Sequence, residues 1–394
     1  MKVLYFAILT VIDSSLGILK KINGQAQCLI ENNVDIEVII FYRDKSKFID
    51  FNNFSKYFSF VKYDYHGLKR IPQLFRLWRM VDNVINKNKY DIVYFRYYGS
   101  SYFTFQLLKN NPNKIIFEHN TNELFEFKIN SNWPTFVLWN EIYFAKKSFK
   151  YLLGNVGKSS DFSRHQEVKV GYKLNLKTIT NGVVVSNIVK LNKFDKNATN
   201  IISLIFVGNI AMWHGLERLF KGIKNNKSSI KYKLYLVGNE DVFLKQINQY
   251  NLSHLLNKNI FITGFKSGDE LNELFNKSHF AIGSLGLHRL KIVNGVPLKH
   301  REYLSRGIPF IYSGIDEDIN EEVNLFLFNV EPDETAVNFD NLLLFISNEI
   351  MNKEHISSDL IKYAFYTVDM KIKMIELKSF FVERIKSKKL YEVN

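Results

Sequence analysis

The chain has 394 residues, of which 46% are hydrophobic and 23% are charged. This length suits two domains, and the composition is that of a globular protein with a sizeable core in each half. The formal charge of +14 predicts an anionic partner. Because no helix-turn-helix, RNP or zinc-finger pattern is present, nucleic acid is not expected, and acidic lipid headgroups or a phosphorylated substrate are favoured.

The N-terminal stretch 1–12 is apolar, but Asp13 follows at once and no cleavage site precedes the next polar residues. We therefore read it as a buried strand rather than a signal peptide. No segment approaches the roughly 18 apolar residues of a membrane span. The single cysteine, Cys28, excludes an intrachain disulfide and a multi-cysteine zinc site. These features predict a cytoplasmic protein, with peripheral contact at the inner face of the cell membrane.

Short apolar runs alternate with amphipathic stretches along the whole chain. The predicted strands are 2–9, 36–42, 91–97, 114–119 and 150–155, then 202–209, 232–238, 260–265, 280–286 and 309–314. Such alternation predicts α/β architecture with parallel sheets, because parallel strands need helical crossovers. The polar, Asn/Lys-rich segment 186–200 separates the two series and is the predicted linker. Two doubly wound domains would then place a ligand cleft at the carboxyl ends of their strands.

A glycine turn after the strand at 202–209 is the first candidate anion site. Gly208 and Asn209 form the turn, and Gly215 follows close to a helix start. Backbone N–H groups and the positive helix end favour an anion there. A plain βα turn is the equally simple alternative.

The segment 280–314 carries the second candidate site. Gly283 and Gly286 follow a strand, Asn294 and Gly295 form a turn, and a helix from about Pro297 ends at Gly307.

The free N–H groups of Val296, Leu298 and Lys299 at the start of this helix would face a diphosphate. Arg289 and Lys299 are the predicted mobile positive charges, and Glu302 would accept hydrogen bonds from a ribose diol.

At these residues the sequence resembles the family 4 glycosyltransferases, especially bacterial capsule and exopolysaccharide enzymes. The resemblance rests on Gly208, the pair His214-Gly215, Gly264 after the third strand, and the block His288 to Pro309 containing PLKHREYL. It implies a GT-B fold of two Rossmann-like domains: an acceptor-binding domain over 1–190 and a nucleotide-sugar-binding domain over 200–366. A terminal helix at about 367–390 would pack back on the first domain.

The family pattern also contains two carboxylates separated by seven residues. Glu302 matches the second, but the first position holds Asn294, which hydrogen-bonds without carrying charge. His214 stands where many relatives have a diphosphate-binding lysine. Both departures bear on the choice of donor sugar and on turnover.

The N-terminal half resembles the family more loosely. Gly17 matches a loop that touches the donor diphosphate, with a helix-initiating turn as the alternative. His119, at a predicted strand end, matches a histidine that contacts the transferred sugar, although a structural histidine is the more common case. Glu118 and Glu123 are nearby alternatives, and the Asn-Gly-Val segment at 180–188 is read as structural.

Two other signals receive weaker interpretations. Asp316 to Asp318 resembles an Asp-x-Asp metal motif but is predicted to open a helix, where carboxylates suit the dipole, so no metal site is expected. Segments 68–89 and 132–150 combine aromatic and basic residues. Each is either a helix that covers a sheet or an interfacial helix on anionic lipid, with Leu74, Leu77, Trp78 and Val81 on the apolar face of the first.

The resulting hypothesis is a retaining, metal-independent glycosyltransferase without a cofactor. It would move a hexose from a UDP- or GDP-linked donor to a glycan or lipid-linked acceptor in surface polysaccharide synthesis. His119, Arg289 and Lys299 are its predicted catalytic residues. A non-catalytic GT-B scaffold is the alternative, and a nicotinamide oxidoreductase is disfavoured because the first strand lacks G-x-G-x-x-G after it.

Overall fold

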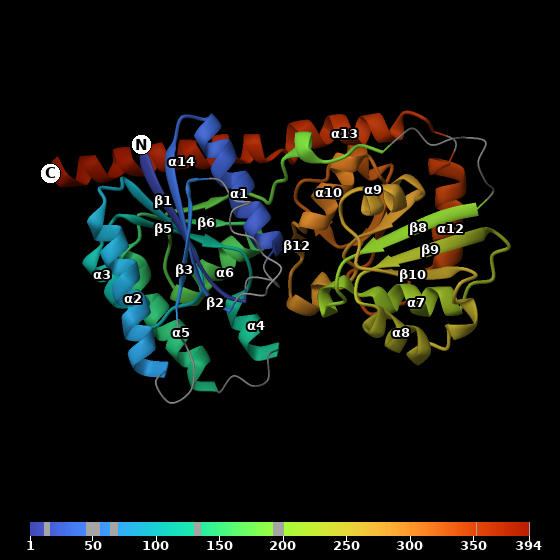
Figure 1. The fold of residues 1–394 in the computed structure, drawn as a ribbon, viewed down its shortest axis with the longest axis horizontal. Coiled ribbons are helices and arrows are strands. Elements are labelled where there is room, and N and C mark those ends of the chain that lie inside the picture. Colours follow the sequence, from blue (N-terminus) through green and yellow to red (C-terminus); the bar gives the residue numbers. More distant parts are fainter. Residues whose placement is uncertain are drawn as a thin grey trace. The chain divides into compact units, whose positions relative to one another are not determined.

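The computed structural model describes residues 1–11, 16–44, 56–63, 70–129, 135–191, 201–351 and 353–393. Its contacts divide the chain into two compact units. Unit 1 contains Met1–Thr180 and Met370–Asn394, and unit 2 contains Asn181–Asp369 (Figure 1). Residues 192–200 of the predicted linker lie outside the described residues.

Unit 1 is built on a seven-stranded parallel sheet with the order β3-β2-β1-β4-β5-β6-β7. The strands are β1 (Lys2–Val11), β2 (Asp35–Asp44), β3 (Phe58–Lys62), β4 (Ile92–Arg96), β5 (Ile115–His119), β6 (Gly154–Gly157) and β7 (Leu176–Thr178). The central strands are apolar on both sides because helices cover both faces. The strand order reverses between β1 and β4, which is where doubly wound sheets bind ligands.

The helices of unit 1 are α1 (Leu16–Glu31), α2 (Arg70–Lys87), α3 (Tyr102–Asn110), α4 (Glu123–Ile129), α5 (Thr135–Ser148), α6 (Ser160–Val170) and α14 (Met370–Val393), with a 3-10 turn at Phe149–Tyr151. Ser101 and Ser159 cap α3 and α6 by accepting backbone N–H bonds. The long helix α14 packs beside α1 (Figure 1). Its Phe381 lies 5.4 Å from the ring of Tyr94, which joins the C-terminus to the core of unit 1.

Unit 2 contains a six-stranded parallel sheet with the order β10-β9-β8-β11-β13-β15. Its strands are β8 (Ile201–Val207), β9 (Lys231–Val237), β10 (Ile260–Gly264), β11 (Phe280–Ile282), β13 (Phe310–Ser313) and β15 (Phe328–Val330). A short pair, β12 (Asn294–Gly295) with β14 (Ile315–Asp316), lies apart from the sheet. The order reverses between β8 and β11.

The helices of unit 2 are α7 (Leu216–Lys224), α8 (Glu240–Gln249), α9 (Gly268–Asn276), α10 (Leu298–Arg306), α11 (Glu321–Asn324), α12 (Phe339–Phe345) and α13 (Ile356–Thr367). Single turns occupy Val185–Asn187, Met212–His214, Ser253–Leu255 and Leu287–Leu290, and a π-helical turn spans Ile346–Ile350. Gly307 caps α10 in the left-handed conformation at φ 79°, so the predicted C-cap is confirmed.

The predicted α/β class with parallel sheets is confirmed. The short strands β3, β7 and β15 were not predicted, because each has five residues or fewer and a weak pattern. The strand predicted at 150–155 is wrong in position, since Phe149–Tyr151 forms a 3-10 turn and the strand begins at Gly154. In the described parts of the chain, no helix is both long enough and apolar enough to cross a membrane.

Candidate active site

The carboxyl ends of β8 and β11 meet where the sheet order of unit 2 reverses. Gly208 follows β8 with φ 135°, a conformation that favours glycine. A Cβ on Gly208 would lie 3.8 Å from Nζ of Lys299 and 3.9 Å from Cε1 of His214. The glycine turn, His214 and the first turn of α10 therefore lie close together, which joins the two candidate anion sites of the sequence; binding of a diphosphate there stays a prediction.

Lys299 is the most unusual group at this point. Its Nζ is shielded from solvent and has no hydrogen-bond partner among the described residues, although part of its stem is exposed. The nitrogen lies 3.9 Å from the ring centroid of Phe206. Burial lowers the pKa of Lys299 to about 7, against a smaller raising effect from Glu302. An uncompensated buried amine is costly, and an anionic ligand beside it would relieve the cost.

His214 supplies a neutral donor next to this lysine. Burial, followed by the charge of Lys299, lowers the pKa of His214 to about 3. The ring Nδ1 accepts the N–H of Ala211 at 3.3 Å, so the proton of the neutral ring resides on Nε2. His214 can therefore donate a hydrogen bond to a phosphate oxygen but adds no positive charge.

A buried ion cluster, which sequence reasoning missed, fixes the start of α10. His300 accepts the N–H of Ser284 on Nε2 at 3.1 Å, and its Nδ1 faces Asp316 at 2.8 Å. Arg301 pairs with both Asp316 and Asp318. Burial alone would raise the pKa of Asp316, but Arg301 and His300 lower it to about 2.

This cluster corrects the interpretation of the acidic run. Asp316 ends strand β14, and the next helix, α11, starts only at Glu321. The expectation that Asp316 to Asp318 opens a helix is wrong, because these carboxylates neutralise the buried Arg301 instead. Among the residues that the structure describes, no cluster of three or more His, Cys, Asp or Glu side chains is arranged to hold a metal ion.

Gly283 permits the same cluster to form. A Cβ at this residue would lie 2.7 Å from Nε2 of His300 and 2.6 Å from the carbonyl oxygen of Ile311. The absence of a side chain therefore lets β11 approach the ring of His300 closely. Asn181 also holds this region, because its Nδ2 donates to the carbonyl oxygen of Val296 just before α10 at 2.9 Å.

Glu302 lies on the next turn of α10 with its side chain 35% exposed. Arg306 donates to its Oε1 from Nε at 3.0 Å and from Nη2 at 2.8 Å. The second oxygen, Oε2, receives neither of these bonds. The predicted bond from a ribose diol is therefore compatible with this pairing, and it stays a prediction.

Arg289 is held differently from the mobile cation that the sequence predicted. It pairs with Glu217 and Glu334, and the bond from Nη2 to Glu334 is 2.5 Å long. Hydrogen bonding to Glu334 raises the pKa of Arg289 above its usual value. Two carboxylates balance its charge in this structure. Its predicted catalytic role stays a prediction and requires at least one of these pairs to open.

The remaining predicted residues of unit 2 lie on loops, strand ends and the start of α10. Asn209 is exposed beside Gly208, Leu298 opens α10, and Val296 is buried just before it. Asn294 and Gly295 form β12. Gly264 ends β10 with φ 70° and accepts the N–H of Gly238, which places it at the neighbouring strand end.

In unit 1, His119 ends β5 and is fully buried. Its Nε2 faces Asn155 at 2.9 Å, and its Nδ1 lies 3.5 Å from Glu123. Glu118 is also buried and pairs with Lys158 at 2.9 Å. Gly17 is exposed in the first turn of α1. Among the described residues, Nδ1 of His119 has no hydrogen-bond partner, and the contact of His119 with a transferred sugar stays a prediction.

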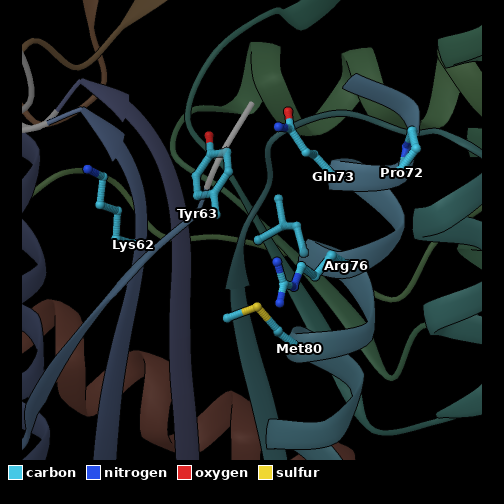
Figure 2. A pocket seen from close by; sticks show the side chains of 7 residues that line it. Lys62, Tyr63, Pro72, Gln73, Arg76 and Met80 are labelled. Carbon is cyan, nitrogen blue, oxygen red and sulfur yellow. The ribbon is translucent and has the colours of Figure 1, made fainter. Parts of the chain in front are cut away.

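Unit 1 contains a pocket of about 460 Å³ beside the end of β3. Pro72, Leu77 and Met80 give it apolar walls, and Lys62 and Arg76 give it positive charge. Figure 2 shows Arg76 and Met80 extending from α2 toward the strand that carries Lys62. This combination suits a ligand with an apolar part and a negative charge.

Comparison with known proteins agrees with this geometry. Residues 190–356 match the family model described as "Glycosyl transferases group 1". No curated protein sequence matches the chain. The matched stretch lies within unit 2 and includes Gly208, Lys299 and Glu302.

Several solved structures share the fold over the whole chain. A glycosyltransferase from Rickettsia africae aligns with TM-score 0.65 and 14% identity, covering 98% of each chain. Anabaena Alr3699/HepE in complex with UDP and glucose aligns with TM-score 0.63 and 14% identity, covering 97% of this chain and 100% of that one. Sucrose-phosphate synthase from Thermosynechococcus elongatus gives 0.69 and 11%, covering 99% and 100%. The predicted GT-B fold with two Rossmann-like domains is confirmed.

Proposed function

We propose that the protein is a glycosyltransferase that binds the diphosphate of a nucleotide sugar at the carboxyl ends of β8 and β11. The observation that carries the proposal concerns Lys299. Its buried Nζ lies close to Gly208 and His214 and has no hydrogen-bond partner in the part of the chain that the structure describes. The match of residues 190–356 to the group 1 glycosyltransferases supports it. An oxyanion beside Lys299 would also face the unpaired N–H groups at the start of α10.

The donor is a UDP- or GDP-linked hexose, and UDP-glucose is the first candidate to test because Anabaena Alr3699/HepE was solved with UDP and with UDP-glucose. Glu302 holds the ribose through Oε2. No cofactor is required. The role that a metal ion would have, stabilising the diphosphate charge, falls to fixed hydrogen-bond donors: Lys299, the Nε2–H of His214 and the backbone amides of Leu298 and Lys299. Donors that are already oriented stabilise the negative charge of a leaving phosphate without reorganisation.

In the transfer step, the bond from the anomeric carbon to the phosphate oxygen breaks and the acceptor hydroxyl oxygen bonds to that carbon. The leaving diphosphate takes up the hydroxyl proton. Retention of configuration follows the resemblance to family 4, and His119 and Arg289 keep their proposed catalytic roles at the sugar and at the diphosphate. Arg289 first releases Glu334, and a phosphate oxygen of the donor then takes the place of that carboxylate.

The acceptor is a glycan or a lipid-linked sugar in surface polysaccharide synthesis, and unit 1 binds it. The pocket beside β3 supports this part, because Arg76 and Lys62 suit a phosphate while Leu77 and Met80 suit an apolar group (Figure 2). These are the features of a phosphorylated lipid carrier.

A second candidate function, a scaffold that binds sugar nucleotide without turnover, is favoured by specific observations. Asn294 replaces a carboxylate, and Glu217 and Glu334 neutralise Arg289. The two functions differ in a single measurement, the release of free nucleoside diphosphate.

The test combines binding and turnover. A panel of UDP- and GDP-linked sugars is screened by thermal shift, and the best ligand is then incubated with membrane extracts while nucleoside diphosphate is measured. A stabilising ligand whose effect is lost in Lys299→Met but kept in Lys224→Met, together with nucleotide release, supports the transferase. Binding without release supports the scaffold. Absence of any stabilising nucleotide sugar refutes both.

A further inference from the structure

The outward face of α5 in unit 1 is aromatic rather than polar. Phe136, Trp139 and Tyr143 are 69%, 73% and 51% exposed. Their spacing of three and four residues places them along one side of the helix. The opposite side packs inward through Glu141, Ala145 and Ser148. A helix that covers a sheet normally directs charged and polar residues outward, so this face requires another explanation.

Neighbouring helices extend the aromatic surface. Tyr102 of α3 is 48% exposed, and its ring lies 6.2 Å from Phe144. Phe75 of α2 is 53% exposed and stacks edge-on against Phe103 at 4.7 Å. The exposed rings therefore form one band across α5, α3 and α2.

The fully exposed charges around this band are basic, and the one partly exposed carboxylate of these helices, Asp82, accepts from Asn86 and Asn111. In the described side chains of α2, α3 and α5, every charged residue that is exposed is basic; these are Arg76, Arg79, Lys87, Lys109, Lys146 and Lys147. Lys150 follows directly after α5 and is exposed as well. The acidic Glu141 of α5 is buried and paired with Lys169 at 2.9 Å. The surface thus combines aromatic rings with an excess of positive charge.

We propose that this face, centred on Phe136, Trp139 and Tyr143, docks on a bilayer surface rich in anionic phospholipid. Aromatic rings settle at the headgroup level, and basic side chains meet the anionic headgroups. Lys147 lies 4.4 Å from the ring centroid of Tyr143, so both kinds of contact occur on one short stretch of helix. Charge complementarity favours this occupant over a second copy of the chain, whose identical face carries the same charge.

For 68–89, the structure favours the first of the two alternatives, a helix that covers the sheet. Trp78 is only 8% exposed and packs on Phe95 at 6.3 Å, so it belongs to the core. Leu77 and Val81 are buried with it. The apolar face of α2 covers the sheet, and Phe75 is the aromatic side chain of this helix that joins the exposed band.

The test is co-sedimentation of the full chain with vesicles of phosphatidylcholine alone or with 30% phosphatidylglycerol, a fraction of about one third that gives strong surface charge. The parent should bind only the anionic vesicles, and binding should fall as salt rises. The double variant Phe136→Ser, Trp139→Ser should bind roughly tenfold to a hundredfold more weakly. Its matched control is Phe265→Ser in unit 2, which removes a ring that is also 69% exposed.

A second pair of variants tests the charge. Lys146, Lys147 and Lys150 changed to Gln should lower the affinity for anionic vesicles roughly fivefold per lysine at low salt. The control changes the exposed Lys224, Lys245 and Lys258 of unit 2 to Gln. The two triple variants therefore have the same net charge as each other. Equal losses in both triple variants would overturn the proposal. So would absence of parent binding, or a parent dimer in light scattering that the Phe136→Ser, Trp139→Ser variant converts to monomer.

Discussion

Replacing Lys299 by Met should stabilise unit 2 while weakening donor binding. The folded-state pKa of Lys299 is about 7, whereas an exposed lysine titrates near 10.5. Because the folded pKa is lowered, the charge destabilises the fold; the penalty is complete below pH 7 and disappears as pH rises toward 10.5. From the difference between the folded and unfolded pKa values, charged Lys299 lowers the free energy of unfolding by no more than about 4 kcal/mol at pH 7 and about 2 kcal/mol at pH 9.

We therefore expect Lys299→Met to raise the free energy of unfolding by about 2 to 4 kcal/mol at pH 7, with the gain shrinking by about 2 kcal/mol at pH 9. Urea denaturation should be followed through fluorine-labelled Trp213, the one tryptophan in the sequence of Asn181–Asp369. Lys224→Met on the exposed surface of α7 is the control and should change stability by less than about 0.5 kcal/mol.

The same variant should bind the best nucleotide sugar at least tenfold more weakly, since a hydrogen bond to a charged group contributes about 1.5 to 3 kcal/mol. A destabilised Lys299→Met, or a stability gain that does not change between pH 7 and pH 9, would refute the reasoning about its buried amine.

Three further outcomes follow from the same site. Affinity for a nucleotide sugar should fall by roughly tenfold between pH 6.5 and 8.5, because Lys299 loses its proton above pH 7 and the anion binds the charged form; calorimetry that shows a flat profile would contradict this. Arg301→Met should destabilise unit 2 by about 3 to 5 kcal/mol in urea denaturation, because it removes the guanidinium that neutralises Asp316 and leaves this buried carboxylate beside His300 without that positive charge. An unchanged midpoint would count against the cluster. Gly283→Ala should cost about 1 to 3 kcal/mol by forcing the ring of His300 away, and it should weaken nucleotide binding in the same thermal-shift assay; full binding in this variant would show that the ring position is unimportant.

The sequence predicted backbone features correctly where the signal was local. Gly208 after β8 and Gly307 after α10 are each placed by the few residues around them, because glycine marks backbone that other residues adopt with difficulty. Lys299 was expected near the diphosphate from its position in the first turn of α10. Its burial over Phe206 required knowledge of a strand about ninety residues earlier in the chain, which only the fold supplies.

Long-range pairing explains most of what the sequence did not reveal. Arg289 was expected to be mobile, yet Glu334, distant along the chain, holds it. Arg218 is buried and donates to the carbonyl oxygens of Leu285, Thr335 and Glu331, and nothing in its own neighbourhood predicted this role. Local spacing carries no information about such partners.

The two amphipathic segments show a related ambiguity. Both 68–89 and 132–150 mix aromatic and basic residues, so their patterns alone do not say which rings face the sheet. Packing of Trp78 against Phe95 settles the question for α2, and the 73% exposure of Trp139 settles it for α5.

A crystal structure of the full chain with the best-binding nucleotide sugar tests the central claim most directly. The account predicts diphosphate oxygens within hydrogen-bond distance of Nζ of Lys299 and of the backbone amides that open α10. A diphosphate bound in unit 1, or bound in unit 2 away from Lys299 and Gly208, would contradict it.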